Sequence, residues 1–119
     1  MILIVDDSTT NQVLLEVILN EEGYKTETAF GAKDAFKIIE KQKPSLILLD
    51  LLMPEISGLD FLKQIKKSKS NSDIPIIIIS AVGTKENIDL CIEEGAIEFM
   101  AKPIDIPYFI ERVKAIVSK

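Results

Sequence analysis

Apolar residues gather into short unbroken runs, and the longer segments between them carry apolar residues every three or four positions. The runs at 2–5, 46–49 and 74–79 show no alternation of apolar and polar side chains. Such runs are typical of strands that are buried on both faces, as in a parallel sheet. A more polar run at 24–28 predicts a second strand near a sheet edge, and 97–100 predicts a short last strand.

The five segments that follow these runs have helical periodicity. Thr9 and Gln12 have the spacing of a capping box at the start of the first helix. Thr84 and Asp105 are suitable N-caps for the fourth and fifth helices, and Gly23 ends the first. The apolar stripes of the five helices contain these residues: Leu14, Leu15, Ile18 and Leu19; Ala32, Ala35, Phe36 and Ile39; Leu59, Phe61, Leu62 and Ile65; Ile88, Cys91 and Ile92; Ile106, Phe109, Ile110, Val113, Ile116 and Val117.

The order of elements is strand then helix, five times over, with no linker, repeat or low-complexity segment. This pattern predicts one α/β domain over residues 1–119, a doubly wound five-stranded parallel sheet with helices on both faces. Right-handed crossovers and the polar second strand favour the strand order 2-1-3-4-5, as in flavodoxin-like folds. The order of the strands then reverses between the first and third, where open α/β sheets bind their ligands.

Acidic residues follow both of those strands. Asp6 and Asp7 end the first, and Asp50 ends the third, before Met53-Pro54 and Gly58. Taken singly, each acid reads equally well as a turn, cap or loop residue. Together, three carboxylates in one pocket repel one another. A hard divalent cation held by oxygens resolves that repulsion, and we expect Mg²⁺, with Mn²⁺ as an alternative ion.

Two further polar residues end the fourth and fifth strands. Ser80 is followed by Ala81, and Lys102 is followed by Pro103. A strand-end hydroxyl commonly satisfies local backbone, and most lysines are solvated. At this sheet edge, however, Ser80 would face the pocket, and Lys102 would lie beside three carboxylates. A cation at that place suits phosphoryl transfer, which needs charge neutralisation and positioning more than an acid or a base.

Composition narrows the functional classes. The 119 residues are 47% hydrophobic and carry a net charge of −5, which argues against a basic surface for nucleic acid. One cysteine and no histidine exclude an internal disulfide and make zinc an unsuitable metal. The first apolar run ends at Asp6 and has no basic residues before it, so neither a signal peptide nor a membrane span fits. We therefore expect a cytoplasmic protein.

The ordered motifs Val5-Asp6-Asp7, Asp50 with Met53-Pro54 and Gly58, Ser80-Ala81 and Lys102-Pro103 resemble those of receiver domains of two-component response regulators, over the whole chain. The resemblance implies that Asp50 accepts a phosphoryl group from a phosphohistidine on a sensor histidine kinase or histidine phosphotransfer protein. Phosphorylation would switch the face of the fourth helix, fifth strand and fifth helix, and so control an effector protein or output domain. No turnover of an external substrate is expected.

The resemblance also implies a role for each site residue. Asp7 and Asp50 would bind Mg²⁺ directly, together with the main-chain carbonyl of Leu52, and Asp6 would act partly through water. Lys102 and Ser80 would contact the phosphoryl group. Ser80 and the aromatic Phe99 would form the switch, and the Lys102–Pro103 peptide bond would be cis. If the chain is complete it is a stand-alone receiver; if it was cut from a longer protein, its output domain is missing.

Three alternatives remain at this stage. Flavin-binding proteins share the fold, although Asp6-Asp7 would repel a flavin phosphate. Aspartyl-phosphate phosphatases commonly place a second acid two residues after the nucleophile, where this chain has Leu52. The third alternative is a degenerate receiver, an interaction module that works without phosphorylation.

Two surface features are open to more than one interpretation. Val13 and Val17 lie beside the main stripe of the first helix, and a broad core stripe or ordinary surface positions are the favoured interpretation. The alternative is a docking surface for the phosphodonor that also includes Thr10, Asn11 and Leu14. The lysines of the third helix are expected to form a solvated helix end that complements the helix dipole: Lys63, Lys66, Lys67 and Lys69.

Overall fold

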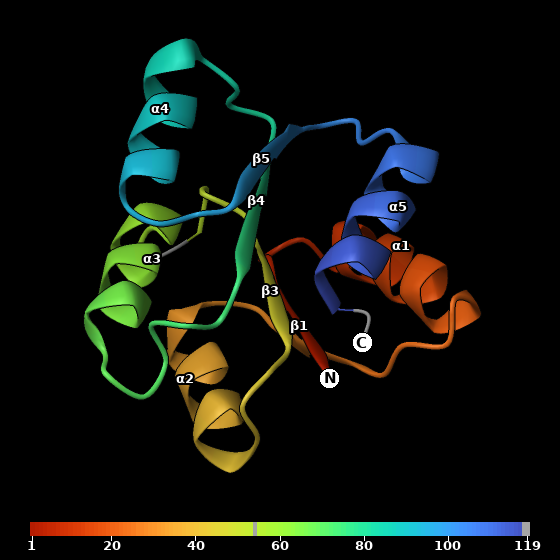
Figure 1. The fold of residues 1–119 in the computed structure, drawn as a ribbon, viewed down its shortest axis with the longest axis horizontal. Coiled ribbons are helices and arrows are strands. Elements are labelled where there is room, and N and C mark those ends of the chain that lie inside the picture. Colours follow the sequence, from red (N-terminus) through yellow and green to blue (C-terminus); the bar gives the residue numbers. More distant parts are fainter. Residues whose placement is uncertain (54, 118–119) are drawn as a thin grey trace.

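The computed structural model describes residues 1–53 and 55–117, which form one parallel sheet with helices on both faces (Figure 1). The ten elements alternate along the chain as follows: β1 (Ile2–Val5), α1 (Thr9–Glu21), β2 (Thr26–Ala29), α2 (Ala32–Lys41), β3 (Leu46–Leu49), α3 (Gly58–Lys67), β4 (Ile76–Ser80), α4 (Lys85–Glu93), β5 (Glu98–Ala101) and α5 (Ile106–Val117). The strand order is β2-β1-β3-β4-β5, with every pair parallel. The predicted fold class and topology are therefore confirmed.

The unbroken apolar strands supply two hydrophobic cores, one on each face of the sheet. Leu3 and Val5 of β1 belong to the core under α2, α3 and α4, whereas Ile2 and Ile4 belong to the core under α1 and α5. The residues of β3 and β4 divide between the cores in the same alternating way. In Figure 1, α1 and α5 lie on one side of the sheet and α2, α3 and α4 on the other. Burial on both faces explains why these strands show no polar alternation.

Three strands are displaced from their predicted bounds. β2 spans Thr26–Ala29 rather than 24–28, β4 spans Ile76–Ser80 rather than 74–79, and β5 spans Glu98–Ala101 rather than 97–100. Burial and strand pairing are separate properties, and only burial is visible in an apolar run. Ile74 is buried, for example, although it lies before β4.

The start of α1 also differs from its prediction. Ser8 is the N-cap, and its hydroxyl accepts the Asn11 N–H, so Thr9 does not cap the helix. Gln12 is buried and does not act in a capping box; its amide instead donates to main-chain carbonyls outside the helix. Leu14, assigned to the core stripe, is 46% exposed, and Val13 and Val17 are each 50% exposed. The core face of α1 is narrower than its apolar pattern indicates.

Thr84 and Asp105 do cap their helices, because Thr84 accepts the Asn87 N–H and Asp105 accepts the Tyr108 N–H. In contrast, the lysine cluster of α3 is not wholly solvated. The Lys66 ammonium is partly buried and donates to the carbonyls of Ser72 and Ile74, at 3.1 and 2.8 Å. Burial lowers the pKa of Lys66, although nearby Asp73 acts in the opposite direction.

None of the helices within residues 1–53 and 55–117 combines the length and apolarity that a membrane crossing needs.

Candidate functional site

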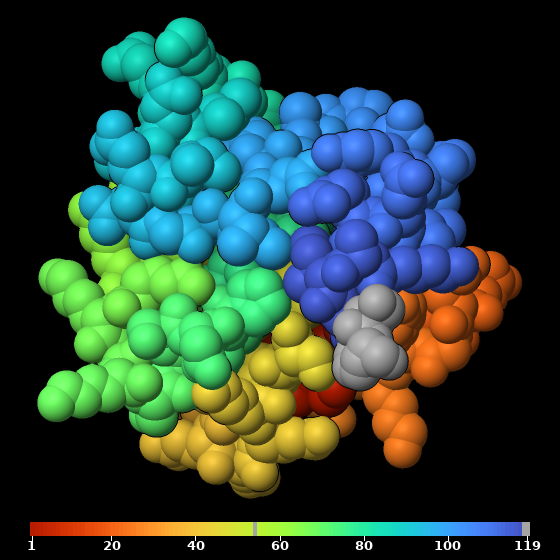
Figure 2. Space-filling view, in the orientation of Figure 1, coloured from red at the N-terminus to blue at the C-terminus, as the bar shows by residue number. Residues whose placement is uncertain are grey.

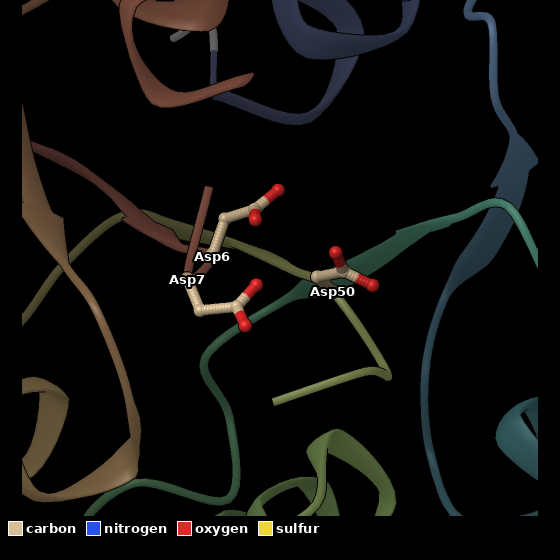
Figure 3. Close-up of side chains that lie close together, drawn as sticks. All are labelled: Asp6, Asp7 and Asp50. Carbon is tan, nitrogen blue, oxygen red and sulfur yellow. The ribbon is translucent and has the colours of Figure 1, made fainter. Parts of the chain in front are cut away.

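The predicted acids meet at the carboxyl edge of the sheet because β1 and β3 are neighbours. Val5 is paired with Leu49, so the residues that follow each strand emerge side by side. The Asp50 N–H donates to the Val5 carbonyl at 3.0 Å, which extends this pairing past the end of β3. Asp6, Asp7 and Asp50 therefore extend from adjacent strand ends toward the same space (Figure 3).

The three carboxylates form a close cluster. One carboxylate oxygen from each of Asp6, Asp7 and Asp50 lies within 4.8 Å of the others. Asp6 and Asp50 are buried, whereas Asp7 is exposed. Main-chain amides fix the two buried groups, since Asp6 Oδ1 accepts the Ser8 N–H at 2.8 Å and Asp50 Oδ1 accepts the Leu52 N–H at 3.0 Å. The cluster is thus rigid at its base and open to solvent at Asp7.

Lys102 joins the cluster from the end of β5. Its Nζ donates to Asp50 Oδ2 at 3.0 Å and to Asp6 Oδ2 at 3.3 Å. The side chain is 22% exposed, so these ion pairs lie at the boundary between protein and solvent. The Lys102–Pro103 peptide bond is cis, as the resemblance implies. The site therefore holds three carboxylates and one ammonium.

Burial and charge act against each other in this cluster. Burial raises the pKa of Asp6, and repulsion by Asp50 adds to the effect, while the Ser8 N–H and the Lys102 ammonium oppose it. Burial alone would lower the pKa of Lys102, but its hydrogen bonds to Asp50 and Asp6 and their negative charges outweigh burial, so the pKa of Lys102 is raised. Lys102 is accordingly a cation throughout the neutral pH range.

The loop after Asp50 is held against the start of α3. Gly58, the first residue of that helix, donates its N–H to the Leu51 carbonyl at 2.9 Å. A Cβ atom at Gly58 would lie 2.3 Å from the Asp50 carbonyl oxygen and 2.6 Å from the Leu51 Cα. Only glycine allows this approach. Pro54, part of the predicted motif, lies outside the described residues.

Ser80 and Phe99 lie on neighbouring strands beside the cluster. Ser80 ends β4 and is fully buried, and its hydroxyl accepts the Val82 N–H at 3.2 Å. In this arrangement the Ser80 oxygen stabilises the β4–α4 loop through that hydrogen bond. Phe99 in β5 is partly buried and packs against the core under α4. A Cβ atom at Gly83 in the same loop would lie 3.7 Å from the Phe99 ring, so the loop and the ring are close neighbours.

The donor set fits a hard divalent cation. Magnesium binds oxygen at about 2.1 Å, which places ligands on opposite sides of one ion about 4.2 Å apart. Carboxylate oxygens within 4.8 Å of one another are compatible with direct ligation by some and water-mediated ligation by others. The contact observed at Leu52 involves its N–H, so ligation by its carbonyl stays a prediction.

Sequence reasoning missed the part that Gln12 plays next to the site. Its amide Nε2 donates to the carbonyl of Asp6 at 2.8 Å and to that of Ala29 at 2.9 Å. A usable signal was present, because Gln12 lies three and seven positions before Leu15 and Leu19 and therefore on the same helical face. A polar residue on a core face is a candidate for a specific buried hydrogen bond.

Comparison with known proteins identifies the class. The model of the response regulator receiver domain family matches residues 2–114. The chain therefore belongs to the receiver-domain family of two-component response regulators, and membership implies phosphoacceptor signalling.

Two curated relatives are similar over nearly their whole length. Sporulation initiation phosphotransferase F of Bacillus subtilis (strain 168) is 39% identical over 113 residues, which cover 95% of this chain and 90% of the relative. The polar-differentiation response regulator DivK of Brucella anthropi is 31% identical over 114 residues, covering 96% and 93%. The phosphate regulon transcriptional regulatory protein PhoB of Pseudomonas aeruginosa is 34% identical, but this chain covers only 52% of it.

Solved structures agree on the architecture. The receiver domain of NtrX from Brucella abortus superposes with a TM-score of 0.91 at 32% identity, covering 100% of this chain and 99% of that one. A response regulator from Chloroflexus aurantiacus gives a TM-score of 0.92 at 30% identity, covering 99% and 97%.

Proposed function

We propose that Asp50 is the phosphoacceptor of a magnesium-dependent receiver, with a phosphohistidine of a sensor histidine kinase or histidine phosphotransfer protein as the donor. The observation that carries this proposal is the position of Asp50, a buried carboxylate that bonds to the Lys102 ammonium at 3.0 Å and lies beside the Asp6 and Asp7 carboxylates. Phosphoryl transfer needs a positioned nucleophile with positive charge beside it, and here an ammonium and a candidate metal site supply that charge.

In the transfer step, a carboxylate oxygen of Asp50 forms a bond to phosphorus while the bond from phosphorus to the donor imidazole nitrogen breaks, and the electron pair stays on that nitrogen. Bound at Asp6, Asp7 and Asp50, Mg²⁺ would supply positive charge that offsets the phosphoryl oxygens. Lys102 is already within hydrogen-bond distance of Asp50, so its ammonium would also neutralise negative charge on the phosphoryl oxygens. The Ser80 hydroxyl oxygen accepts the Val82 N–H, and its own O–H would be the donor to a phosphoryl oxygen.

The test is incubation with acetyl phosphate with and without Mg²⁺, followed by intact-mass measurement. One phosphoryl group per chain is expected, and only with the metal. No labelling under any metal condition would favour the degenerate receiver. Release of product from a chromogenic phosphate ester over many turnovers would favour the phosphatase, whereas we propose no turnover of external substrate. A yellow purified protein would indicate a flavin.

For donor docking, we propose the exposed side of α1 and the groove next to it. Leu14 is 46% exposed, and it lines a cavity of about 440 Å³ that reaches Lys102. Lining residues that share this apolar character are Leu15, Ile79, Pro103, Ile104 and Ile106. An apolar groove that ends at the phosphoacceptor's own lysine suits a partner that delivers a phosphohistidine to Asp50.

For the output, we propose that phosphorylation switches the α4–β5–α5 face, which forms a continuous surface in Figure 2. If Ser80 turns toward the new phosphoryl group, the β4–α4 loop loses a hydrogen bond and the Phe99 ring beside it gains room. Tightly packed elements respond to such changes by moving between two arrangements. An effector protein or output domain would then read the new surface.

This switch predicts where amide resonances move. On phosphorylation with acetyl phosphate and Mg²⁺, NMR spectra should show large changes from Thr84 to Phe99 as well as around Asp50. The control is Asp50→Asn under the same conditions, which should show only the effects of metal and donor. Changes confined to the pocket of the phosphorylated wild type would contradict the switch.

We also predict a long-lived phosphoryl group, because apolar side chains flank the pocket. Leu52 is 57% exposed two residues after Asp50, and Val82 lies two residues after Ser80. Both line a cavity next to α4, and neither can hydrogen-bond an attacking water. Leu52→Asn and Val82→Glu should each lose the phosphoryl label several-fold faster in Mg²⁺ buffer, because they can position water in line with phosphorus. Equal or slower decay in both variants would show that these positions do not set the lifetime.

A further inference from the structure

Gln12 is the buried polar residue of α1 whose side chain reaches the backbone of the acidic cluster. It is 4% exposed, and its Nε2 donates to the Asp6 carbonyl at 2.8 Å and to the Ala29 carbonyl at 2.9 Å. A primary amide has two N–H donors, so both are used. The side chain thus ties α1 to the chain segments that leave β1 and β2.

The hydrogen bonds of Gln12 satisfy main-chain carbonyls at the point where the β1–β2 pairing ends. Beyond Val5, the Asp6 N–H still bonds to the Ala29 carbonyl at 3.0 Å, but the Asp6 carbonyl has left the strand ladder. Asp6 is 3% exposed, and a buried carbonyl without a donor is costly. Gln12 supplies that donor and holds the end of β1 against the end of β2.

This hydrogen bond has a direct consequence for the carboxylates. The Asp6 carbonyl belongs to the planar peptide unit that joins Asp6 to Asp7, so a donor on that oxygen fixes the direction in which the chain turns toward Asp7. The Ser8 N–H fixes the Asp6 carboxylate itself. The Asp7 side chain is exposed, and the direction in which it leaves the backbone depends on the Asp6–Asp7 peptide. The Gln12 amide holds that peptide through its hydrogen bond to the Asp6 carbonyl.

We propose that Gln12 is a positioning residue for the metal site, which sets Mg²⁺ affinity by orienting the Asp6–Asp7 peptide. This inference rests on the proposed function of the acidic cluster. Gln12 would act through the backbone, because its amide nitrogen is bonded to the Asp6 and Ala29 carbonyls. Groups that orient metal ligands commonly change affinity by about 10- to 100-fold when they are removed.

The test compares Gln12→Met with the wild type by calorimetric titration with Mg²⁺. Methionine matches glutamine in length but has no N–H donor, so the Mg²⁺ Kd should rise at least about tenfold. Gln12→Asn is the second variant: it keeps an amide but withdraws it by one methylene, and it too should bind Mg²⁺ more weakly. The control is Ile18→Val, which removes one methyl group from the same buried face of α1 and should leave the Kd unchanged.

A spectroscopic signature separates positioning from general stability. The Asp7 amide belongs to the same peptide unit as the Asp6 carbonyl, so its NMR resonance should move in both Gln12 variants and stay in place in Ile18→Val. Wild-type affinity in folded Gln12→Met and Gln12→Asn would overturn the proposal, as would equal weakening in Ile18→Val. A wild-type chain that binds no Mg²⁺ would instead overturn the proposed function on which the inference rests.

Discussion

Replacing Asp50 with asparagine should reduce labelling by acetyl phosphate to the background level. The amide oxygen of asparagine can still accept the Leu52 N–H, so the loop keeps its anchor. The variant lacks the anionic oxygen that would bond to phosphorus, and it loses one of the two ion pairs of Lys102. The substitution therefore removes the nucleophilic oxygen and leaves the shape of the side chain nearly unchanged. Intact-mass measurement after incubation with acetyl phosphate and Mg²⁺ gives the result directly.

Asp34→Asn makes the same chemical change at an exposed residue in the first turn of α2 and should label like the wild type. Chelation of Mg²⁺ should stop labelling of the wild type as completely as Asp50→Asn does, because both remove parts of one site. A phosphoryl group that persists on Asp50→Asn would show that another residue is the acceptor.

The sequence was a good guide wherever one physical cause dominates. Unbroken apolar runs such as 46–49 are buried on both sides, so the parallel sheet and its order follow from hydrophobicity and chain handedness. The site followed in turn, because parallel neighbouring strands bring their ends together. Asp6, Asp7 and Asp50 converge for that reason, and Lys102, which follows β5, bonds to Asp6 and Asp50.

Prediction failed where several causes compete. Ser8 stands one residue before Thr9 and is the stronger N-cap by residue type, and its hydroxyl accepts the Asn11 N–H. Lys66 looked solvated because a lysine pattern cannot show that the loop after α3 turns its carbonyls toward that side chain. Gln12 was assigned a local role, although its partners lie at the ends of β1 and β2. For Lys66 and Gln12 the deciding partners are main-chain carbonyls outside the helix that carries the side chain.

In the sequence Gly58 stands out only as part of the motif that follows Asp50, yet its contacts predict one of the larger mutational effects in the chain. Gly58→Ala puts a methyl group 2.3 Å from the Asp50 carbonyl oxygen and 2.6 Å from the Leu51 Cα. Both are main-chain atoms, so no side-chain rotation relieves the clash, and either α3 or the Asp50 loop must move. We expect a loss of about 2–3 kcal/mol in the free energy of unfolding, typical of overpacking a buried site.

Because the displaced backbone carries Asp50, Gly58→Ala should also label with acetyl phosphate much more slowly than the wild type, even at temperatures where it is fully folded. Urea unfolding and a labelling time course measure the two effects. Gly31→Ala is the matched control: its added methyl group meets nothing within 4 Å, and its backbone is extended. As a change at the N-cap of α2, it should cost less than about 1 kcal/mol and leave labelling intact. Equal stability of the Gly58 and Gly31 variants would contradict the close approach of α3 to the Asp50 backbone, and wild-type labelling of Gly58→Ala would show that this approach does not position the acceptor.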